Sequence, residues 1–142
     1  MTSAHVPRAL RALVEAQARH RCGYCLTPEH LVGAPLEIEH LFPTALGGRT
    51  EETNLWLACS LCNSYKGTHV VVFDSASGGL VPLFNPRHQV WRDHFAWTES
   101  GDRIVGLTSI GRATVVALNL NRSSLVQTRR AWVSVGWHPP KD

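Results

Sequence analysis

Two pairs of cysteines with the same spacing constrain this chain more than any other feature of its sequence. Cys22 and Cys25 form the first Cys-x-x-Cys pair, Cys59 and Cys62 form the second, and 33 residues separate the pairs. Four thiolates in this arrangement suit a tetrahedral Zn²⁺ ion. A closed shell of four sulfurs leaves no coordination position for a substrate. We therefore expect structural zinc that ties the end of an N-terminal helix to the start of a later one.

Disulfides and an iron–sulfur cluster are the alternative states of these cysteines. The first residues, MTSAHVPRAL, lack the apolar core of a secretion signal. No apolar run in the chain approaches the roughly 20 residues that cross a bilayer. We therefore expect a cytoplasmic protein that is not inserted in a membrane. Thiols stay reduced in the cytoplasm, which disfavours disulfides. The Cys-x-x-Cys spacing within each pair fits zinc better than an iron–sulfur cluster.

The length and charge of the chain favour one domain with an uneven surface. Its 142 residues, 44% of them apolar, suit a single globular domain spanning 1–142. Residues 1–84 carry six Lys or Arg and seven acids, whereas residues 85–142 carry eight and four, which gives net charges of −1 and +4. A basic second half permits a polyanionic partner, and it is equally consistent with a solvated basic surface.

Hydrophobic spacing and turn residues predict the elements around the cysteine pairs. A helix is expected from Pro7 to about His20, and residues 27–35 read as a loop. Strands are predicted at 36–41 and 54–59, and a helix at 60–67 with Ser60 as a candidate cap. The order between and after the pairs is therefore strand, loop, strand, helix.

The second half of the chain predicts further strands followed by helices. The DSASGG cluster separates two short apolar strands, and aromatic strand segments follow, with a turn at Glu99–Asp102. Two helices are expected next. The first would be capped by Thr108 or Ser109, and the second would be capped by Ser123 or Ser124 and ended by Gly136. The basic positions of these helices are expected to form a solvated face; they are Arg112, Arg129 and Arg130.

An acid and a histidine lie side by side between the cysteine pairs. In LEIEHLFPTALGG, Glu39 precedes His40 at the end of a predicted strand, where neighbours point to opposite faces unless the strand ends there. A carboxylate is a hard ligand for Mg²⁺ or Mn²⁺, and a neutral imidazole accepts protons well. Taken alone, the pair is better explained as a surface acid beside a packed histidine.

Three side chains complete a candidate site. Asn63, directly after the last cysteine, offers an amide oxygen as a second hard ligand. Lys66 lies one turn further on, where its ammonium could reach a phosphate or the edge of a metal site. Asn54, at the start of the second strand, can hydrogen-bond the backbone on both sides and hold the loop that carries His40.

This pattern closely resembles the HNH endonucleases over roughly residues 20–67. The matching positions are Cys22, Cys25, Ile38, Glu39, His40, Pro43, Gly47, Gly48, Asn54, Leu55, Cys59, Cys62, Asn63 and Lys66. The resemblance implies an α+β chain with a ββα-metal, treble-clef-like nuclease core at 20–70. A zinc ion bound by the four cysteines would stabilise that core, and the N-terminal helix would precede it. Residues 71–142 would form a strand-plus-helix extension, and parts of it resemble a tail found on some small bacterial HNH proteins.

The resemblance also implies roles for the site residues. His40 matches the general base and Asn54 the middle asparagine. Asn63 matches the last residue of the triad, where asparagine is a common variant of histidine. Glu39 stands where aspartate is more frequent, and together with Asn63 it would hold one Mg²⁺ or Mn²⁺. The implied activity is hydrolysis of phosphodiester bonds in DNA, most naturally double-stranded.

Four basic residues are candidates for contacts with the nucleic-acid backbone: Lys66, Arg49, Arg87 and Arg92. Two other functions remain open. One is a zinc-stabilised module that binds nucleic acid without cutting it, and the other is a nuclease directed at RNA. Binding alone needs no general base, so the presence of His40 with its neighbours favours an enzyme.

Overall fold

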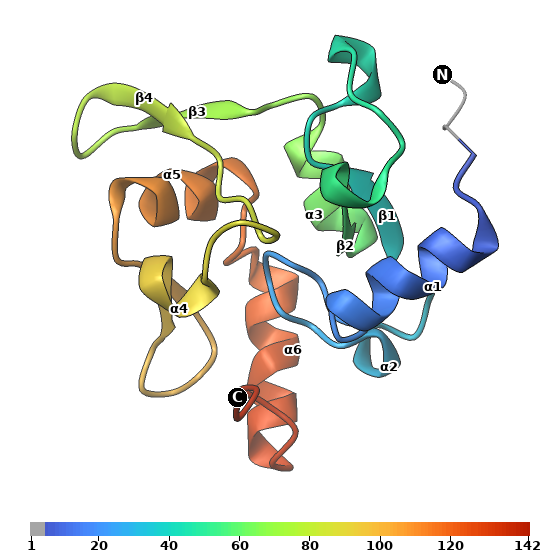
Figure 1. Ribbon diagram of the computed structural model, residues 1–142. Helices are drawn as coiled ribbons and strands as arrows, with labels where there is room; N and C mark the ends of the chain where they lie inside the picture. Colours follow the sequence, from blue (N-terminus) through green and yellow to red (C-terminus); the bar gives the residue numbers. More distant parts are fainter. Residues whose placement is uncertain (1–4) are drawn as a thin grey trace. The chain divides into compact units, whose positions relative to one another are not determined.

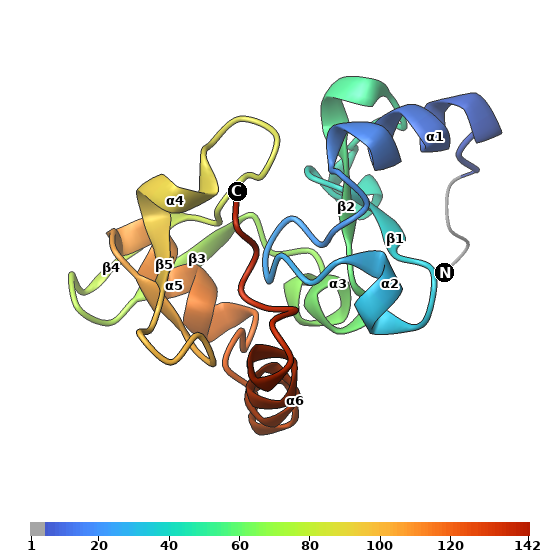
Figure 2. The ribbon, with the colours of Figure 1, turned by 90° about the horizontal axis from the view of Figure 1, so that it is seen from below.

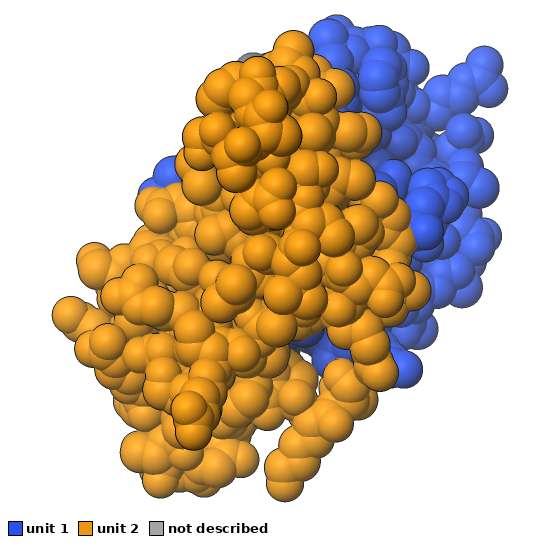
Figure 3. All heavy atoms as spheres, turned by 90° about the vertical axis from the view of Figure 1, so that its left-hand side faces the viewer, with its two compact units in different colours: residues 1–70, 85–88 blue, residues 71–84, 89–142 orange. Residues whose placement is uncertain are grey.

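The computed structural model describes residues 5–142, and its chain forms two compact units. Unit 1 comprises the chain up to residue 70 together with residues 85–88 (Figure 3). Unit 2 comprises residues 71–84 and 89–142. The expected mixture of helices and short antiparallel strands is confirmed (Figure 1). Within residues 5–142 no helix combines the length and the apolar character that a membrane span requires.

Unit 1 is built from helices around one short hairpin. Its elements are α1 (Arg8–Gln17), α2 (Glu29–Val32), β1 (Glu37–His40), the 3-10 turns η1 (Thr44–Leu46) and η2 (Glu52–Asn54), β2 (Leu55–Ala58) and α3 (Ser60–Lys66). The predicted N-terminal helix, both strands and the helix that begins at Ser60 are confirmed. The predicted loop at 27–35 is wrong in part, because one turn of helix, α2, forms within it.

The β1–β2 hairpin is the centre of unit 1. The strands pair antiparallel, with Glu37 opposite Ala58 and His40 opposite Leu55. Leu55 and Leu57 are fully buried, α1 packs on β2, and Val14 is the buried residue of α1. Helix α3 lies beside the hairpin in both ribbon views (Figures 1 and 2). Helix α3 begins at Ser60 with Cys59 at its N-cap position, so the predicted cap is displaced by one residue.

Unit 2 contains two hairpins and three helices. They are β3 (Val71–Asp74), β4 (Gly79–Pro82), α4 (Trp91–His94), β5 (Phe95–Trp97), β6 (Ile104–Gly106), α5 (Ser109–Ala117) and α6 (Ser123–Ser134). Helix α5 and strand β3 lie side by side in Figures 1 and 2. The aromatic stretch predicted as strand is wrong over α4, which forms one helical turn before β5.

The caps of the last two helices differ from each other. Thr108 caps α5 as predicted, because its hydroxyl oxygen accepts a hydrogen bond from the backbone N–H of Gly111 at 3.0 Å. Helix α6 has Arg122 at its N-cap position and no side-chain cap, so the predicted serine cap is wrong. Gly111 also allows a close approach, since a Cβ there would lie 2.0 Å from the carbonyl oxygen of His94.

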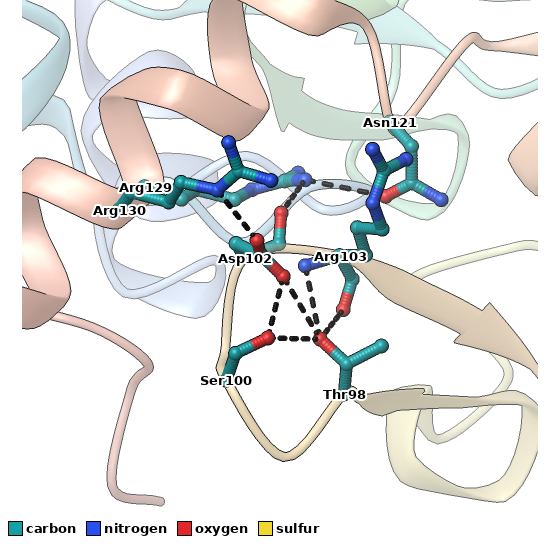
Figure 4. A network of polar contacts seen from close by, with 7 residues as sticks. All are labelled: Thr98, Ser100, Asp102, Arg103, Asn121, Arg129 and Arg130. Atoms are coloured by element: carbon teal, nitrogen blue, oxygen red, sulfur yellow. Dashed lines mark hydrogen bonds and ion pairs between the residues drawn. The ribbon is translucent and has the colours of Figure 1, made fainter.

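A polar network around Asp102 ties the β5–β6 turn to α6 (Figure 4). The carboxylate accepts hydrogen bonds from Ser100 and from Arg130, each at 2.8 Å. Arg129 is fully buried, donates to the carbonyl oxygen of Asp102 at 3.3 Å and lies over the Trp97 ring at 5.2 Å. Arg112 pairs with Asp74 at 3.0 Å. The predicted solvated face is therefore wrong for Arg129, which is fully buried, whereas the side chains of Arg112 and Arg130 are 41% and 60% exposed and each pairs with a distant carboxylate.

Candidate active site and metal centre

The four cysteines meet inside unit 1. All four are buried, none forms a disulfide, and their sulfurs lie within 4.8 Å of one another. The Sγ atoms of Cys25 and Cys59 are 3.8 Å apart. A tetrahedron with Zn–S bonds of about 2.3 Å has edges of about 3.8 Å, whereas a disulfide bond measures about 2.05 Å. The cluster therefore has the dimensions of a zinc site.

Local backbone geometry builds the first pair into a tight turn. The backbone N–H of Leu26 donates to the carbonyl oxygen of Cys22 at 3.0 Å, and Leu26 has a positive φ of 59°. Gly23 donates its N–H to the carbonyl oxygen of Leu57 at 2.9 Å, which attaches the turn to β2. A Cβ at Gly23 would lie 2.4 Å from the Trp56 ring, so only glycine fits.

The shifted pKa values of Cys22 and Cys25 fit a cluster that binds a cation. Burial raises the pKa of the Cys22 thiol well above its ordinary value. Hydrogen bonds from Cys22, Cys59 and Cys62 lower the pKa of Cys25. Thiols alone therefore cannot all ionise in this buried space, whereas a Zn²⁺ ion stabilises four thiolates together. The four buried cysteines are positioned to hold structural zinc.

Glu39 is buried, and its two carboxylate oxygens have different surroundings. Oε1 accepts a hydrogen bond from the Tyr24 hydroxyl at 2.8 Å and lies 3.6 Å from the Lys66 ammonium. Oε2 is buried and has no hydrogen-bond partner among the described residues. Burial raises the pKa of the carboxyl, against the opposing effects of Lys66 and Tyr24. A cation at Oε2 would satisfy this orphaned oxygen and keep the carboxylate ionised.

His40 ends β1, and its ring is held by a threonine. Its Nε2 and the Thr50 hydroxyl oxygen are 2.9 Å apart. The ring is partly exposed, and burial, followed by the Lys66 charge, lowers the pKa of the imidazole below its ordinary value. His40 is therefore neutral at neutral pH, the state in which an imidazole accepts a proton.

Asn54 fixes the loop between the two strands. Its side-chain oxygen accepts from the backbone N–H of Phe42 at 2.8 Å. Its side-chain nitrogen donates to the carbonyl oxygens of Phe42 and Arg49, at 3.0 and 2.8 Å. The amide thus clamps both ends of the segment that follows His40, which is the contact pattern that the sequence predicts for it.

Asn63 has a partner that sequence reasoning missed. Its side-chain nitrogen donates to the carboxylate of Glu37 at 2.8 Å. Glu37 and Glu39 are two residues apart on β1, so their side chains share a face of the strand. This alternation was the available signal, but the sequence gives no indication that Asn63 lies opposite.

One pocket collects most of the predicted site. It has a volume of about 1070 Å³, and its lining includes Glu37, Glu39, His40, Asn63 and Lys66. Asn54 is not among its lining residues and acts on the loop instead. Two residues with hard oxygen donors and one neutral imidazole therefore line a common space large enough for a phosphate with its metal ion and waters.

The four predicted nucleic-acid contacts have different surroundings. Lys66 is 3% exposed and donates to the carbonyl oxygen of His40 at 3.0 Å, so its ammonium is occupied inside unit 1. Arg87 donates to the carbonyl oxygen of Leu55 at 3.1 and 3.0 Å and lies over Trp56. Arg49, in unit 1, and Arg92, in unit 2, are exposed at the surface.

Comparison with known proteins gives one match. The model of the HNH endonuclease family matches residues 22–74. Neither the curated proteins nor the solved structures yield a match. The matched segment contains both cysteine pairs and the candidate catalytic side chains Glu39, His40 and Asn63. Residues 22–74 of this chain match the HNH endonuclease family, and the four clustered cysteines fit the paired Cys-x-x-Cys motifs of that segment.

Proposed function

We propose that this protein is a metal-dependent endonuclease that hydrolyses phosphodiester bonds of DNA. The observation that carries the proposal is the shared pocket, in which Glu39, His40 and Asn63 come together within the segment that matches the HNH family. In this proposal residues 20–70 form a ββα-metal core made of β1, β2 and α3. Residues 71–142 form an extension of that core.

His40 is the general base of the proposed reaction. Its Nε2 faces Thr50, so its Nδ1 is the nitrogen that takes a proton from the attacking water. The lowered pKa of the ring keeps this nitrogen unprotonated near pH 7. Asn54 supports the base indirectly, because it fixes the loop that leaves His40.

Glu39 and Asn63 would hold the catalytic metal. The buried, unpartnered Oε2 of Glu39 supports this assignment, as does the amide oxygen that Asn63 keeps once its nitrogen faces Glu37. Bound Mg²⁺ or Mn²⁺ would polarise the phosphate and stabilise charge on the leaving oxygen. Tyr24 and Lys66 would orient Glu39 by engaging its other oxygen.

The DNA backbone would be contacted by exposed basic side chains. Arg49 and Arg92 are exposed and fit this role. Lys66 and Arg87 support the protein around the site, and Lys66 also lines the pocket in which a phosphate would bind. Double-stranded DNA is the proposed substrate.

Incubation of zinc-loaded protein with supercoiled plasmid tests the proposed function. Nicked or linear plasmid should form with Mg²⁺ or Mn²⁺ and should not form in EDTA. Zinc content measured after the EDTA arm shows whether the structural ion survived, and re-addition of Mn²⁺ should restore cleavage. Intact plasmid together with a gel shift would instead establish a binding module. Cleavage confined to an RNA substrate would establish an RNA-directed nuclease.

A further inference from the structure

Glu37 is a second acid on the pocket side of β1. It lies two residues before Glu39, so the two side chains share a face of the strand. Glu37 is exposed, whereas Glu39 is fully buried, and both line the same pocket. The catalytic scheme proposed above uses only Glu39, which leaves Glu37 without a role.

The contact between Glu37 and Asn63 determines which way the Asn63 amide points. A carboxylate oxygen only accepts hydrogen bonds, so the group 2.8 Å from Glu37 Oε1 is the amide nitrogen of Asn63. The amide oxygen is therefore turned away from Glu37. Without this contact, the amide could rotate and present its nitrogen, which does not bind a hard divalent cation.

The charges that line the pocket give Glu37 a second effect. Lys66 lies 3.6 Å from Glu39 and cancels much of its negative charge. Arg11, which also lines the pocket, pairs with Glu15 at 3.7 Å. Glu37 contacts a neutral amide, so this contact leaves its negative charge in place. That charge favours a dication in a pocket whose deeper carboxylate already has a cationic partner.

We propose that Glu37 is a positioning residue of the active site, which turns the Asn63 amide oxygen toward the catalytic metal and adds negative charge to the pocket. This inference rests on the proposed endonuclease function. It assigns Glu37 no proton transfer and no place in the metal's coordination shell.

Mn²⁺ binding to the zinc-loaded protein, measured by titration calorimetry or by the electron spin resonance of free Mn²⁺, tests the inference without cleavage. Glu37→Ala should weaken binding by about 10- to 100-fold, the range for residues that orient a ligand. Glu37→Gln keeps an acceptor for Asn63 and loses only charge, so its loss should be smaller. Glu51→Ala is the matched control, because it removes an exposed acid of unit 1 outside the pocket lining.

A donor swap tests the hydrogen bond itself. Asn63→Asp places two carboxylates face to face and removes the donor of this hydrogen bond. Adding Glu37→Gln to that variant restores a donor and an acceptor in reversed order. The double variant should bind Mn²⁺ more tightly than the sum of the two single effects predicts. The side-chain amide resonance of Asn63 in metal-free protein should shift in Glu37→Ala and much less in Glu37→Gln.

The outcomes separate the two proposals. If wild-type protein binds Mn²⁺ and cuts plasmid while Glu37→Ala matches it in affinity and in the Asn63 resonance, the inference is overturned and the endonuclease stands. Equal weakening in Glu37→Ala and Glu51→Ala would also overturn it, since general charge would then explain the effect. If the wild type neither binds Mn²⁺ nor cuts, the proposed function fails and the role of Glu37 fails with it.

Discussion

The ammonium of Lys66 lies 3.6 Å from the carboxylate of Glu39, and their side chains are 3% and 0% exposed. Removal of one partner from a buried ion pair leaves an uncompensated charge and costs about 3–5 kcal/mol. Lys66→Met should therefore lower the free energy of unfolding by several kcal/mol in urea denaturation. Adding Glu39→Gln to that variant removes the stranded charge and should recover part of the loss. Unchanged stability in Lys66→Met would contradict the buried pair.

Thr50→Val tests how His40 is oriented. The substitution removes the hydroxyl 2.9 Å from Nε2 and keeps the shape of the side chain. A hydrogen bond with a net worth of about 0.5–1.5 kcal/mol corresponds to a rate loss of about 2- to 10-fold. Single-turnover plasmid cleavage measures this loss, and the exposed Thr53→Val is the control. If Thr50→Val cuts at the wild-type rate, the threonine does not orient the base.

The pH dependence of cleavage follows from the state of His40. A general base must be unprotonated, so the rate should fall as pH drops through the pKa of this ring. Burial, followed by the charge of Lys66, places that pKa below the usual 6.5. The acid limb of the rate profile should therefore have its midpoint below pH 6.5. An acid limb above that value would show that a different group limits the rate.

Asp102→Asn tests the polar network of unit 2. Hydrogen bonds from Arg130 and then Ser100 lower the pKa of Asp102 from 3.8 to about 2. Because the folded-state value is depressed, this stabilisation is present above pH 3.8 and is lost as pH falls from there toward 2. Asp102→Asn should destabilise the protein at neutral pH and flatten the loss of stability in that acidic range. Thermal unfolding between pH 2 and 7 measures both effects. Asp93→Asn, an exposed position of unit 2, is the control, and an equal response in both variants would contradict the network.

Cys59→Ser tests the structural metal. Cys59 belongs to both the sulfur cluster and the N-cap of α3, so three remaining sulfurs should hold zinc poorly and the start of α3 should loosen. Elemental analysis should find a loss of zinc, and thermal unfolding should find a large fall in Tm, because metal binding is coupled to folding. Ser60→Ala, at the neighbouring exposed position, should retain both. Full zinc content and a wild-type Tm in Cys59→Ser would refute the structural role.

Local sequence signals predicted much of unit 1. Apolar spacing indicated α1, β1, β2 and α3, and the cysteine spacing indicated the sulfur cluster that the fold assembles. The burial of Lys66 could also be predicted from the sequence, because Lys66 follows Cys62 by four residues and lies on the same face of the helix. The contact between Glu37 and Asn63 could not be predicted from the sequence, because it joins residues 26 positions apart.

Unit 2 shows why the rest could not be predicted. Helix α4 spans four residues, too few to establish a helical period among aromatic neighbours. Arg129 and Arg130 were predicted to lie on a solvated face from their charge alone, and charge does not indicate a partner in the fold. Their partner is Asp102, 27 and 28 residues earlier, which only the folded β5–β6 turn brings to α6.

The most direct test of the account compares plasmid cleavage by zinc-loaded wild-type protein and His40→Ala in Mn²⁺. Loss of a general base should slow cleavage by about 10²- to 10⁴-fold. Zinc content, Tm and Mn²⁺ affinity should stay near the wild-type values, since the His40 ring is assigned to no metal. Cleavage by His40→Ala at the wild-type rate would contradict the central claim that this imidazole activates the attacking water.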